Sequence, residues 1–255
     1  MNTSLKSFLR RLLPRAIRIH RIQGGPLRGY RLVTSWHDYP AAIIGRTERP
    51  LLGWFAKNVK SGETWLDIGA HYGYTAIALS RLVGVSGRVF AFEPMLSTAG
   101  YVTQTRRLNS FPQLIILPFG LAAPETLEMK QLSVTRGMVD STLMRDEGHT
   151  EWQETIMMAR FDWLWPQICG EKPQIDGIKV DVQGMEIEVI RGMMEMLRAK
   201  KPKLVVEIHE GVDRGALLDL IERAGYFRQA LPIEPIAGEV EPQYLDNLSY
   251  AFQAA

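Results

Sequence analysis

The sequence predicts an α/β protein with a mostly parallel sheet and helices on both faces of that sheet. From about residue 47, short apolar stretches alternate with segments in which apolar residues recur at helical spacing. Such alternation is typical of parallel strands, because each helix carries the chain back to the edge where the next strand starts. The 46% hydrophobic content of the 255 residues is enough for one sizeable core.

In the first half of the chain, glycine and proline mark the ends of the expected elements. The apolar stretch TWLDIG ends in a glycine, the next helical segment ends at Gly84, and GRVFAFEP stops at Pro94. The expected elements are, in chain order, a helix over residues 48–59, a strand over 64–69, a helix over 74–84, a strand over 87–94, a helix over 97–110 and a strand over 112–122.

The second half begins with a less regular stretch, about residues 124–173, and then returns to the same alternation. The irregular stretch is a candidate lid or substrate wall, and its aromatic residues either stack on a sugar or, as is more usual, belong to the core; they are Trp152, Phe161, Trp163 and Trp165. The expected elements are strands over residues 126–132 and 154–161, a strand over 175–184, a helix over 185–200, a strand over 202–210, a helix over 212–226 and a strand over 247–253.

The N-terminal part differs from the rest, because residues 5–31 carry eight lysines and arginines and no acid. Apolar residues recur there at helical spacing (Leu5, Phe8, Leu9 and Leu12). We therefore expect a basic N-terminal extension over residues 1–46, which contains an amphipathic helix, and the main domain over residues 47–255. The helix is interpreted as packing on its own domain or on a partner subunit; a peripheral contact with anionic membrane and an organellar transit peptide remain open.

Composition excludes several classes of protein. A net charge of +2 argues against a nucleic-acid binder. The single cysteine, Cys169, excludes an internal disulfide and a cysteine metal cluster and favours a reducing, cytoplasmic location. No apolar run is long enough to span a bilayer.

A glycine turn follows the first predicted strand, and an acid ends the next one. Gly69 and Gly73 flank the turn, Asp67 precedes it, and Glu93 lies where it can accept hydrogen bonds from ribose hydroxyls. A dinucleotide site would favour G-x-G-x-x-G, but the spacing here is G-x-x-x-G, with His71 between the glycines. The pattern favours S-adenosylmethionine over a dinucleotide or an ordinary turn without a ligand.

Charged residues also recur inside two later strands, where a parallel sheet is usually apolar. Lys179 and Asp181 share one face of their strand, and Glu207 and His209 share one face of the next. Lys179 lies deeper and is equally well explained as part of an ion-pair network, whereas Asp181 and His209 lie nearer the strand ends. We therefore interpret those two as candidate catalytic residues.

These motifs resemble the FkbM family of class I S-adenosylmethionine-dependent methyltransferases. LDIGAHYGYTAIAL and VFAFEP are similar to its first two motifs, and ARFDWLW, IDGIKVDVQGMEIEVIRGM and PKLVVEIHE to its later block. The resemblance covers about residues 47–252 and implies a Rossmann-like fold with a seven-stranded sheet. Gln183 stands where the family usually has glutamate, so it cannot serve as a general base.

The combined analysis predicts an O-methyltransferase that uses S-adenosyl-L-methionine, no metal and no nucleic acid, and acts on a hydroxyl of a sugar, glycan or polyketide-type product. The rival hypotheses are a non-catalytic scaffold that keeps the cofactor site, favoured by Gln183, and an NAD-dependent oxidoreductase. Asp181 and His209 are the predicted catalytic residues, and Gln183, Glu186 and Glu207 the predicted substrate contacts. The predicted cofactor contacts are Asp67, Gly69, Ala70, His71, Gly73, Glu93, Pro94, Gly120, Leu121 and Asp181.

Overall fold

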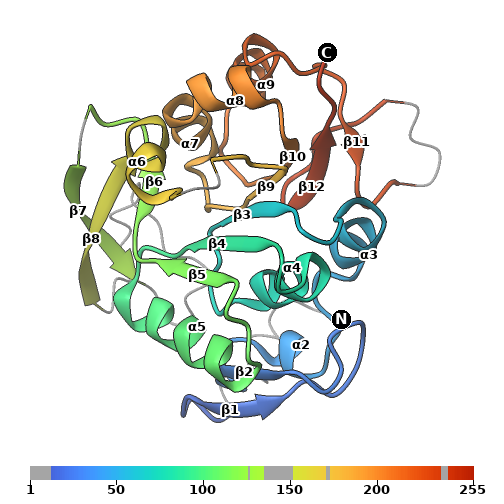
Figure 1. The fold of residues 1–255 in the computed structure, drawn as a ribbon, viewed down its shortest axis with the longest axis vertical. Helices are drawn as coiled ribbons and strands as arrows, with labels where there is room; N and C mark the ends of the chain where they lie inside the picture. The colour runs from blue at the N-terminus through green and yellow to red at the C-terminus, as the bar shows by residue number, and fades with distance from the viewer. Residues whose placement is uncertain (1–12, 126, 135–151, 171–172, 237–240) are drawn as a thin grey trace.

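The computed structural model describes residues 13–125, 127–134, 152–170, 173–236 and 241–255, and its main feature is a seven-stranded sheet (Figure 1). The strand order is β11-β12-β10-β9-β3-β4-β5, in which β12 pairs antiparallel with β10 and β11 and all other pairs are parallel. The strands are β3 (Thr64–Ile68), β4 (Arg88–Phe92), β5 (Leu114–Leu117), β9 (Gly177–Val180), β10 (Lys203–Ile208), β11 (Leu231–Pro232) and β12 (Leu248–Phe252).

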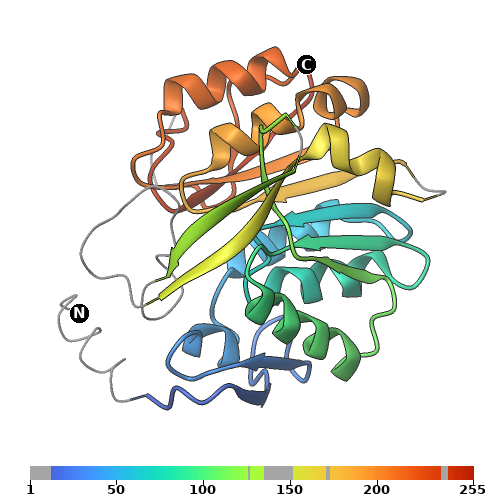
Figure 2. The same cartoon turned by 90° about the vertical axis from the view of Figure 1, so that its left-hand side faces the viewer.

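Helices cover both faces of this sheet, as the sequence predicts. Figures 1 and 2 show α4 and α5 on one side and α7, α8 and α9 on the other. The helices are α2 (Pro40–Ile43), α3 (Arg49–Asn58), α4 (Tyr74–Val83), α5 (Leu96–Leu108), α6 (Phe161–Ile168), α7 (Glu186–Gly192), α8 (Met194–Lys200) and α9 (Arg214–Arg223). No helix among the described residues is long and apolar enough to cross a bilayer.

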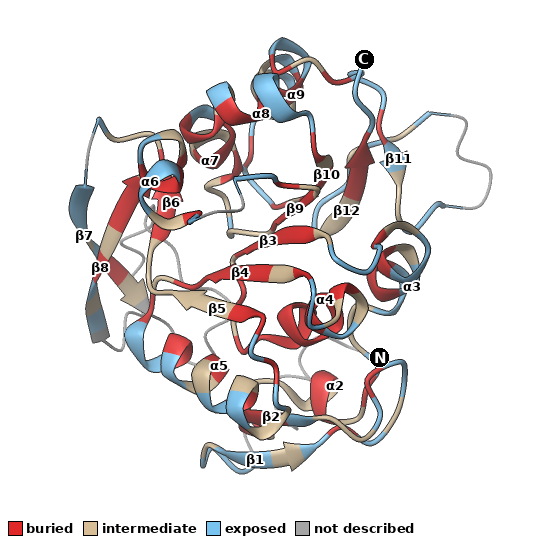
Figure 3. Cartoon of the chain, viewed as in Figure 1, coloured by how far each residue is buried: buried red, intermediate tan, exposed pale blue. Residues whose placement is uncertain are grey.

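Alternating strand residues feed two separate cores. In β3, Leu66 and Ile68 join the core under α7 to α9, whereas Trp65 joins the core under α3 and α4. Figure 3 shows the buried strands at the centre and the exposed surfaces of the helices around them. Because side chains point alternately to the two faces of the sheet, the polar Asp67 and Lys179 lie on the same face as Trp65, in the core under α3 and α4. The pairing of β3 with β9 places these two residues side by side.

Two predicted elements are divided in the structure. The expected strand over residues 112–122 breaks at Pro118, so that β6 (Gly120–Ala122) leaves the main sheet and pairs with β8 (Trp152–Arg160), which also pairs with β7 (Leu127–Val134). The expected helix over 185–200 breaks at Met193 into α7 and α8. At this break Gly192 approaches β6 so closely that a Cβ would lie 1.8 Å from the carbonyl oxygen of Ala122.

The aromatic residues of the irregular stretch divide between core and surface. Phe161 and Trp165 are buried in the core under α7 to α9, as the more usual interpretation predicts. Trp163 on α6 keeps 42% of its surface exposed. The side chain of Trp152 lies outside the described part of the molecule.

The described N-terminal residues pack against helix α5 and one of the two cores. Strands β1 (Arg18–Arg21) and β2 (Arg31–Thr34) form an antiparallel pair beside α5. The side-chain amide of Asn109 forms two hydrogen bonds with the backbone of Arg31 in β2. Its oxygen accepts from the N–H of Arg31 at 2.8 Å, and its nitrogen donates to the carbonyl of Arg31 at 2.7 Å. Leu32 is fully buried in the same core as Trp65. The predicted amphipathic helix over residues 5–12 lies outside the described residues.

Candidate active site

A cavity of about 300 Å³ opens at the carboxyl ends of β3, β4, β9 and β10. Open α/β sheets bind ligands at this edge, and this volume is at the lower end of the range for small-molecule sites. The three-stranded sheet of β6, β7 and β8 forms its apolar wall, to which Leu132, Ile156 and Met158 contribute. The opposite wall is polar and is built from the residues that follow the main strands.

Close packing determines which residues can form the glycine turn after β3. Gly69 has φ +81°, and a Cβ there would lie 1.7 Å from the carbonyl oxygen of Asp181. The N–H groups of Gly69 and Ala70 both donate to the carbonyl of Phe92, at 3.0 Å each. The turn is therefore fixed between β4 and β9, and any larger residue at position 69 would displace it.

Glu93 follows β4 and is 7% exposed. Its two carboxylate oxygens accept backbone hydrogen bonds from His71, at 2.9 Å, and Met95, at 3.1 Å. Burial raises the pKa of Glu93 to about 7, although these hydrogen bonds oppose the shift. A carboxylate has four lone-pair directions, so Glu93 keeps acceptor capacity for a ligand in the cavity.

Lys179 joins the two strands behind the cavity. Its ammonium lies 3.3 Å from Asp67, 3.0 Å from Asp181 and 3.2 Å from the carbonyl oxygen of Gly69. Burial disfavours its charge, but Asp181 and Asp67 outweigh burial and raise the pKa of Lys179. The structure thus shows an ion-pair network around Lys179, one of the two interpretations that the strand pattern left open.

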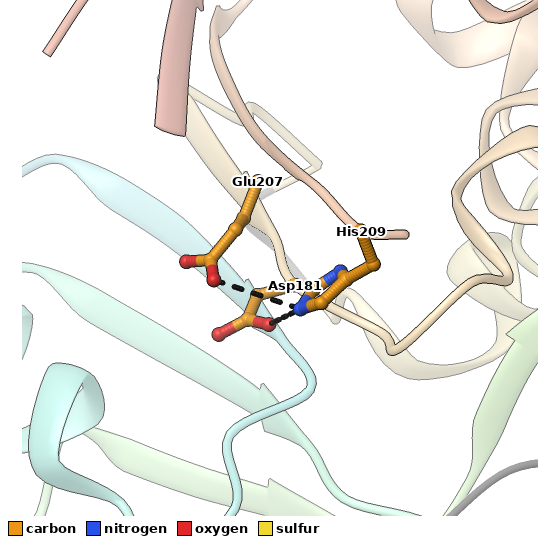
Figure 4. A group of neighbouring side chains, drawn as sticks. All are labelled: Asp181, Glu207 and His209. Atoms are coloured by element: carbon orange, nitrogen blue, oxygen red, sulfur yellow. Dashed lines mark ion pairs between the residues drawn. The ribbon is translucent and has the colours of Figure 1, made fainter. Parts of the chain in front are cut away.

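Four polar groups surround His209, and two of them, Asp181 and Glu207, are drawn with it in Figure 4. Its Nδ1 lies 2.6 Å from Glu186, and its Nε2 lies 3.0 Å from the amide of Gln183, 3.4 Å from Asp181 and 3.5 Å from Glu207. Because a carboxylate only accepts, Nδ1 carries the hydrogen that Glu186 binds. In the neutral ring, Nε2 is left to accept from the Gln183 amide.

The three titratable groups at the strand ends have different pKa shifts. Burial alone would raise the pKa of Asp181, but the charge and hydrogen bond of Lys179, together with His209, outweigh burial and lower that pKa. Burial, followed by the charges of Asp181 and Glu48, raises the pKa of Glu207 to about 7. Burial opposes the charged form of His209, but its hydrogen bond to Glu186 and the nearby acids raise its pKa.

The structure brings most of the predicted site residues to the cavity wall and places others behind it. The predicted residues on the wall are Gly69, His71, Glu93, Pro94, Gly120, Leu121, Asp181, Gln183 and Glu207. Asp67 is fully buried with Lys179 and Thr75, and Glu186 is fully buried against His209. Gly73 packs against Val102 at the start of α4, and His209 is only 5% exposed behind Gln183.

Tyr39 and Glu48 line the cavity, although the sequence did not identify them as site residues. Both belong to the segment before β3, where no strand end draws attention to them. Glu48 stands immediately before Arg49-Pro50, a start signal that identifies a helix but no ligand. A sequence pattern could not have found them, because their position depends on how this segment folds over the glycine turn.

Asp181, Glu207 and His209 also form a group that could hold a metal ion. One ligand atom from each lies within 4.8 Å of the others, and a buried carboxylate on the far nitrogen of a histidine is typical of metal ligands. Here Lys179 already supplies a positive charge to Asp181, and Gln183 is hydrogen-bonded to His209. That the site works without a metal stays a prediction.

Comparison with known proteins identifies the family of the chain. The methyltransferase FkbM domain model matches residues 67–228, more than half of the chain. No sequence among the curated proteins matches the chain.

Solved structures share the fold at low sequence identity. A fibrillarin from Aeropyrum pernix, in complex with natively bound S-adenosyl-L-methionine, superposes with a TM-score of 0.51 at 12% identity, over 93% of this chain and 88% of its own. An rRNA methylase from Streptococcus thermophilus gives 0.50 at 12%, over 83% and 98%. An FkbM methyltransferase from Methylobacillus flagellatus gives 0.49 at 17%, over 78% of this chain and half of its own. The family match over residues 67–228 shows that the chain belongs to the FkbM family of S-adenosylmethionine-dependent methyltransferases.

Proposed function

We propose that this methyltransferase acts on a hydroxyl group of a small molecule, of the sugar, glycan or polyketide type. The observation that carries the proposal is Glu207, a carboxylate on the cavity wall whose pKa is raised to about 7. The hydroxyl of the acceptor has to lose its proton as its oxygen attacks the methyl group. A base whose pKa lies near the working pH removes that proton most effectively. This cavity offers such a base beside its cofactor-binding residues.

The cavity fits S-adenosylmethionine on several counts. Gly69 and Gly120 both line the cavity, and packing requires glycine at each, since a Cβ would lie 1.7 Å from the carbonyl oxygen of Asp181 and 2.3 Å from the sulfur of Met158. Glu93 offers a buried carboxylate for the ribose hydroxyls, and Met95 and Leu121 offer apolar surface for the adenine. The bound cofactor supplies an electrophilic methyl group on its sulfonium.

Comparison of the three acids and bases at the strand ends favours Glu207 as the proton acceptor. Lys179 lowers the pKa of Asp181, which makes that carboxylate a weaker base. His209 lies behind the wall, with Nδ1 bound to Glu186 and Nε2 against Gln183. Glu207 lines the cavity and has the higher acid pKa, so we assign proton removal to it and the positioning of the cluster to His209.

Gln183 then has a role that needs no charge. Its amide contacts His209 Nε2 at 3.0 Å, and an amide can donate there as a carboxylate cannot. Because Glu207 provides the base in our proposal, the glutamine does not by itself indicate a non-catalytic scaffold.

Methyl transfer can be tested with methyl-labelled S-adenosylmethionine and a panel of hexosides and hydroxylated macrolides. We expect label on an oxygen of at least one acceptor, and no transfer from heat-denatured protein. Binding of the cofactor without transfer to any member of the panel would favour the scaffold. Label found only on nitrogen or carbon of an acceptor would contradict the proposal.

Turnover by the wild-type protein should rise with pH and level off above a midpoint near 7. Glu207 accepts a proton only when it is ionised, and its raised pKa delays ionisation to about 7. In Asp181→Asn the midpoint should fall, because a like charge next to Glu207 is removed. The measurement is kcat at saturating cofactor between about pH 5 and 9; a flat profile, or one that falls with pH, would exclude this base.

Glu93→Gln should weaken binding of S-adenosylhomocysteine by about 5- to 150-fold, or ~1–3 kcal/mol. The amide oxygen can accept from the N–H of His71 or from that of Met95, which bind different oxygens of the carboxylate, and the NH2 group would face the other. The variant also loses the charged acceptor that we assign to the ribose. Calorimetric titration measures the change, with Glu222→Gln on the exposed side of α9 as a control that should bind as the wild type does. Unchanged affinity would remove Glu93 from the cofactor site.

A further inference from the structure

Part of the cavity wall comes from a segment that the family match does not include. The match begins at residue 67, yet Tyr39 and Glu48 line the same cavity as Gly69 and Glu93. The ring of Tyr39 lies edge-on to His71, with 5.2 Å between the ring centres. This contact fixes the segment against the glycine turn.

The backbone of Glu48 is held in an unusual conformation. Its φ of 53° and ψ of 24° lie in the left-handed region, which costs a residue other than glycine about 1–3 kcal/mol and is found disproportionately at ligand sites. The next residues start α3, and Glu48 makes no side-chain hydrogen bond to cap that helix. Helix capping therefore does not account for a glutamate in this position.

Three other acids near the cavity are already engaged, and a fourth, Glu207, is the proposed proton acceptor. Glu93 accepts two backbone hydrogen bonds, and Asp181 is paired with Lys179. Asp67, the acid nearest to the turn in sequence, is fully buried between Thr75 and Lys179 and does not line the cavity. Within the described residues, the Glu48 carboxylate accepts one long hydrogen bond, from the hydroxyl of Thr47 at 3.4 Å.

We propose that Glu48 binds the α-ammonium group of S-adenosylmethionine. This inference rests on the cofactor assignment above. An ammonium carries three N–H donors and requires acceptors, whereas the sulfonium has no donor and must face the methyl acceptor. Glu48 lines the cavity together with Gly69 and His71 of the glycine turn. In our assignment Glu93 binds the ribose, so the amino-acid end of the cofactor lies beside the glycine turn and Glu48.

Electrostatics supports the same assignment. Burial raises the pKa of Glu48, and Lys179 offsets this only in part, while Asp181 adds to it. The ionised carboxylate thus lacks a full counter-charge inside the cavity, and a bound ammonium would supply one. A neutral or anionic ligand group in the same place would leave the charge uncompensated.

Two ligands that differ only in the amino group test the proposal. S-Adenosylhomocysteine carries the α-ammonium, and 5′-S-(3-carboxypropyl)-5′-thioadenosine is the same molecule without it. By calorimetry we expect the wild type to bind the first at least about 10-fold more tightly, the effect of a charged hydrogen bond. In Glu48→Gln the difference in affinity between the two ligands, here called the gap, should largely disappear. Affinity for S-adenosylhomocysteine should fall, while affinity for the analogue without the amino group should not change.

The controls separate failure of this proposal from failure of the cofactor assignment. Glu222→Gln should keep the wild-type gap, and thermal unfolding should show that Glu48→Gln remains folded. A gap that persists in Glu48→Gln, or an equal loss for both ligands, would overturn the role of Glu48 and leave the cofactor assignment intact. A wild type that binds neither ligand would overturn both.

Discussion

Glu207→Gln should lower kcat by about 10²- to 10⁴-fold, the usual contribution of a general base. Glutamine has nearly the same size as glutamate and can still contact His209 and Ser249, which lie 3.5 and 3.4 Å from the carboxylate. It cannot take a proton from an acceptor hydroxyl. Affinity for S-adenosylhomocysteine should change little, because the proton acceptor is needed in the transition state and not for cofactor binding.

The matched control for this variant is Glu210→Gln, an exposed glutamate three residues further along the chain, which should keep full turnover. A direct readout is available from carbon-13 resonances of labelled glutamate carboxyls, because burial raises the pKa of both Glu93 and Glu207 to about 7. Glu207→Gln should remove a resonance that titrates near neutrality and leave that of Glu93 in place. Wild-type turnover in Glu207→Gln would place the base elsewhere.

Lys179→Met should destabilise the protein by about 3–5 kcal/mol, the usual cost of removing one partner of a buried ion pair. The side chain of Lys179 is 3% exposed and that of Asp67 is not exposed, so water cannot replace the lost ammonium. Asp181, 23% exposed, would lose its 3.0 Å partner as well. Urea unfolding, followed by circular dichroism, gives the change in the free energy of unfolding.

Two further variants identify the cause of that loss. Lys130→Met removes a lysine from an exposed pair with Glu128 and should cost at most about 1 kcal/mol. The double variant Lys179→Met/Asp67→Asn should recover part of the loss, because it removes one of the uncompensated charges. A loss below about 1 kcal/mol in Lys179→Met would contradict a stabilising role for this network.

The parts of the site that depend on strand periodicity could be predicted from the sequence. Alternation along residues 175–184 places Lys179 and Asp181 on one face, and the structure joins their side chains. Ligands of open α/β sheets bind at the carboxyl ends of the strands, which likewise predicts that Gly69 and Glu93 lie at one cavity. These arguments need only the period of a strand and the direction of neighbouring strands.

The positions that depend on loops could not be predicted in this way. After β9, Gln183 and Gly184 adopt positive φ values of 54° and 96°, and the Gln183 amide contacts His209, which lies behind the cavity wall. No periodicity encodes that reversal. Glu48 reaches the cavity from a segment distant in sequence, and β6 leaves the sheet because Pro118 interrupts the strand before it.

The most direct test of the account is a structure of the protein with S-adenosylhomocysteine bound. We expect the ribose hydroxyls to lie within hydrogen-bonding distance of Glu93 and the sulfur to face the part of the cavity lined by Glu207 and Asp181. That arrangement would leave room for an acceptor hydroxyl between the sulfur and Glu207. A ligand bound with its sulfur turned away from Glu207, or outside this cavity, would contradict the account.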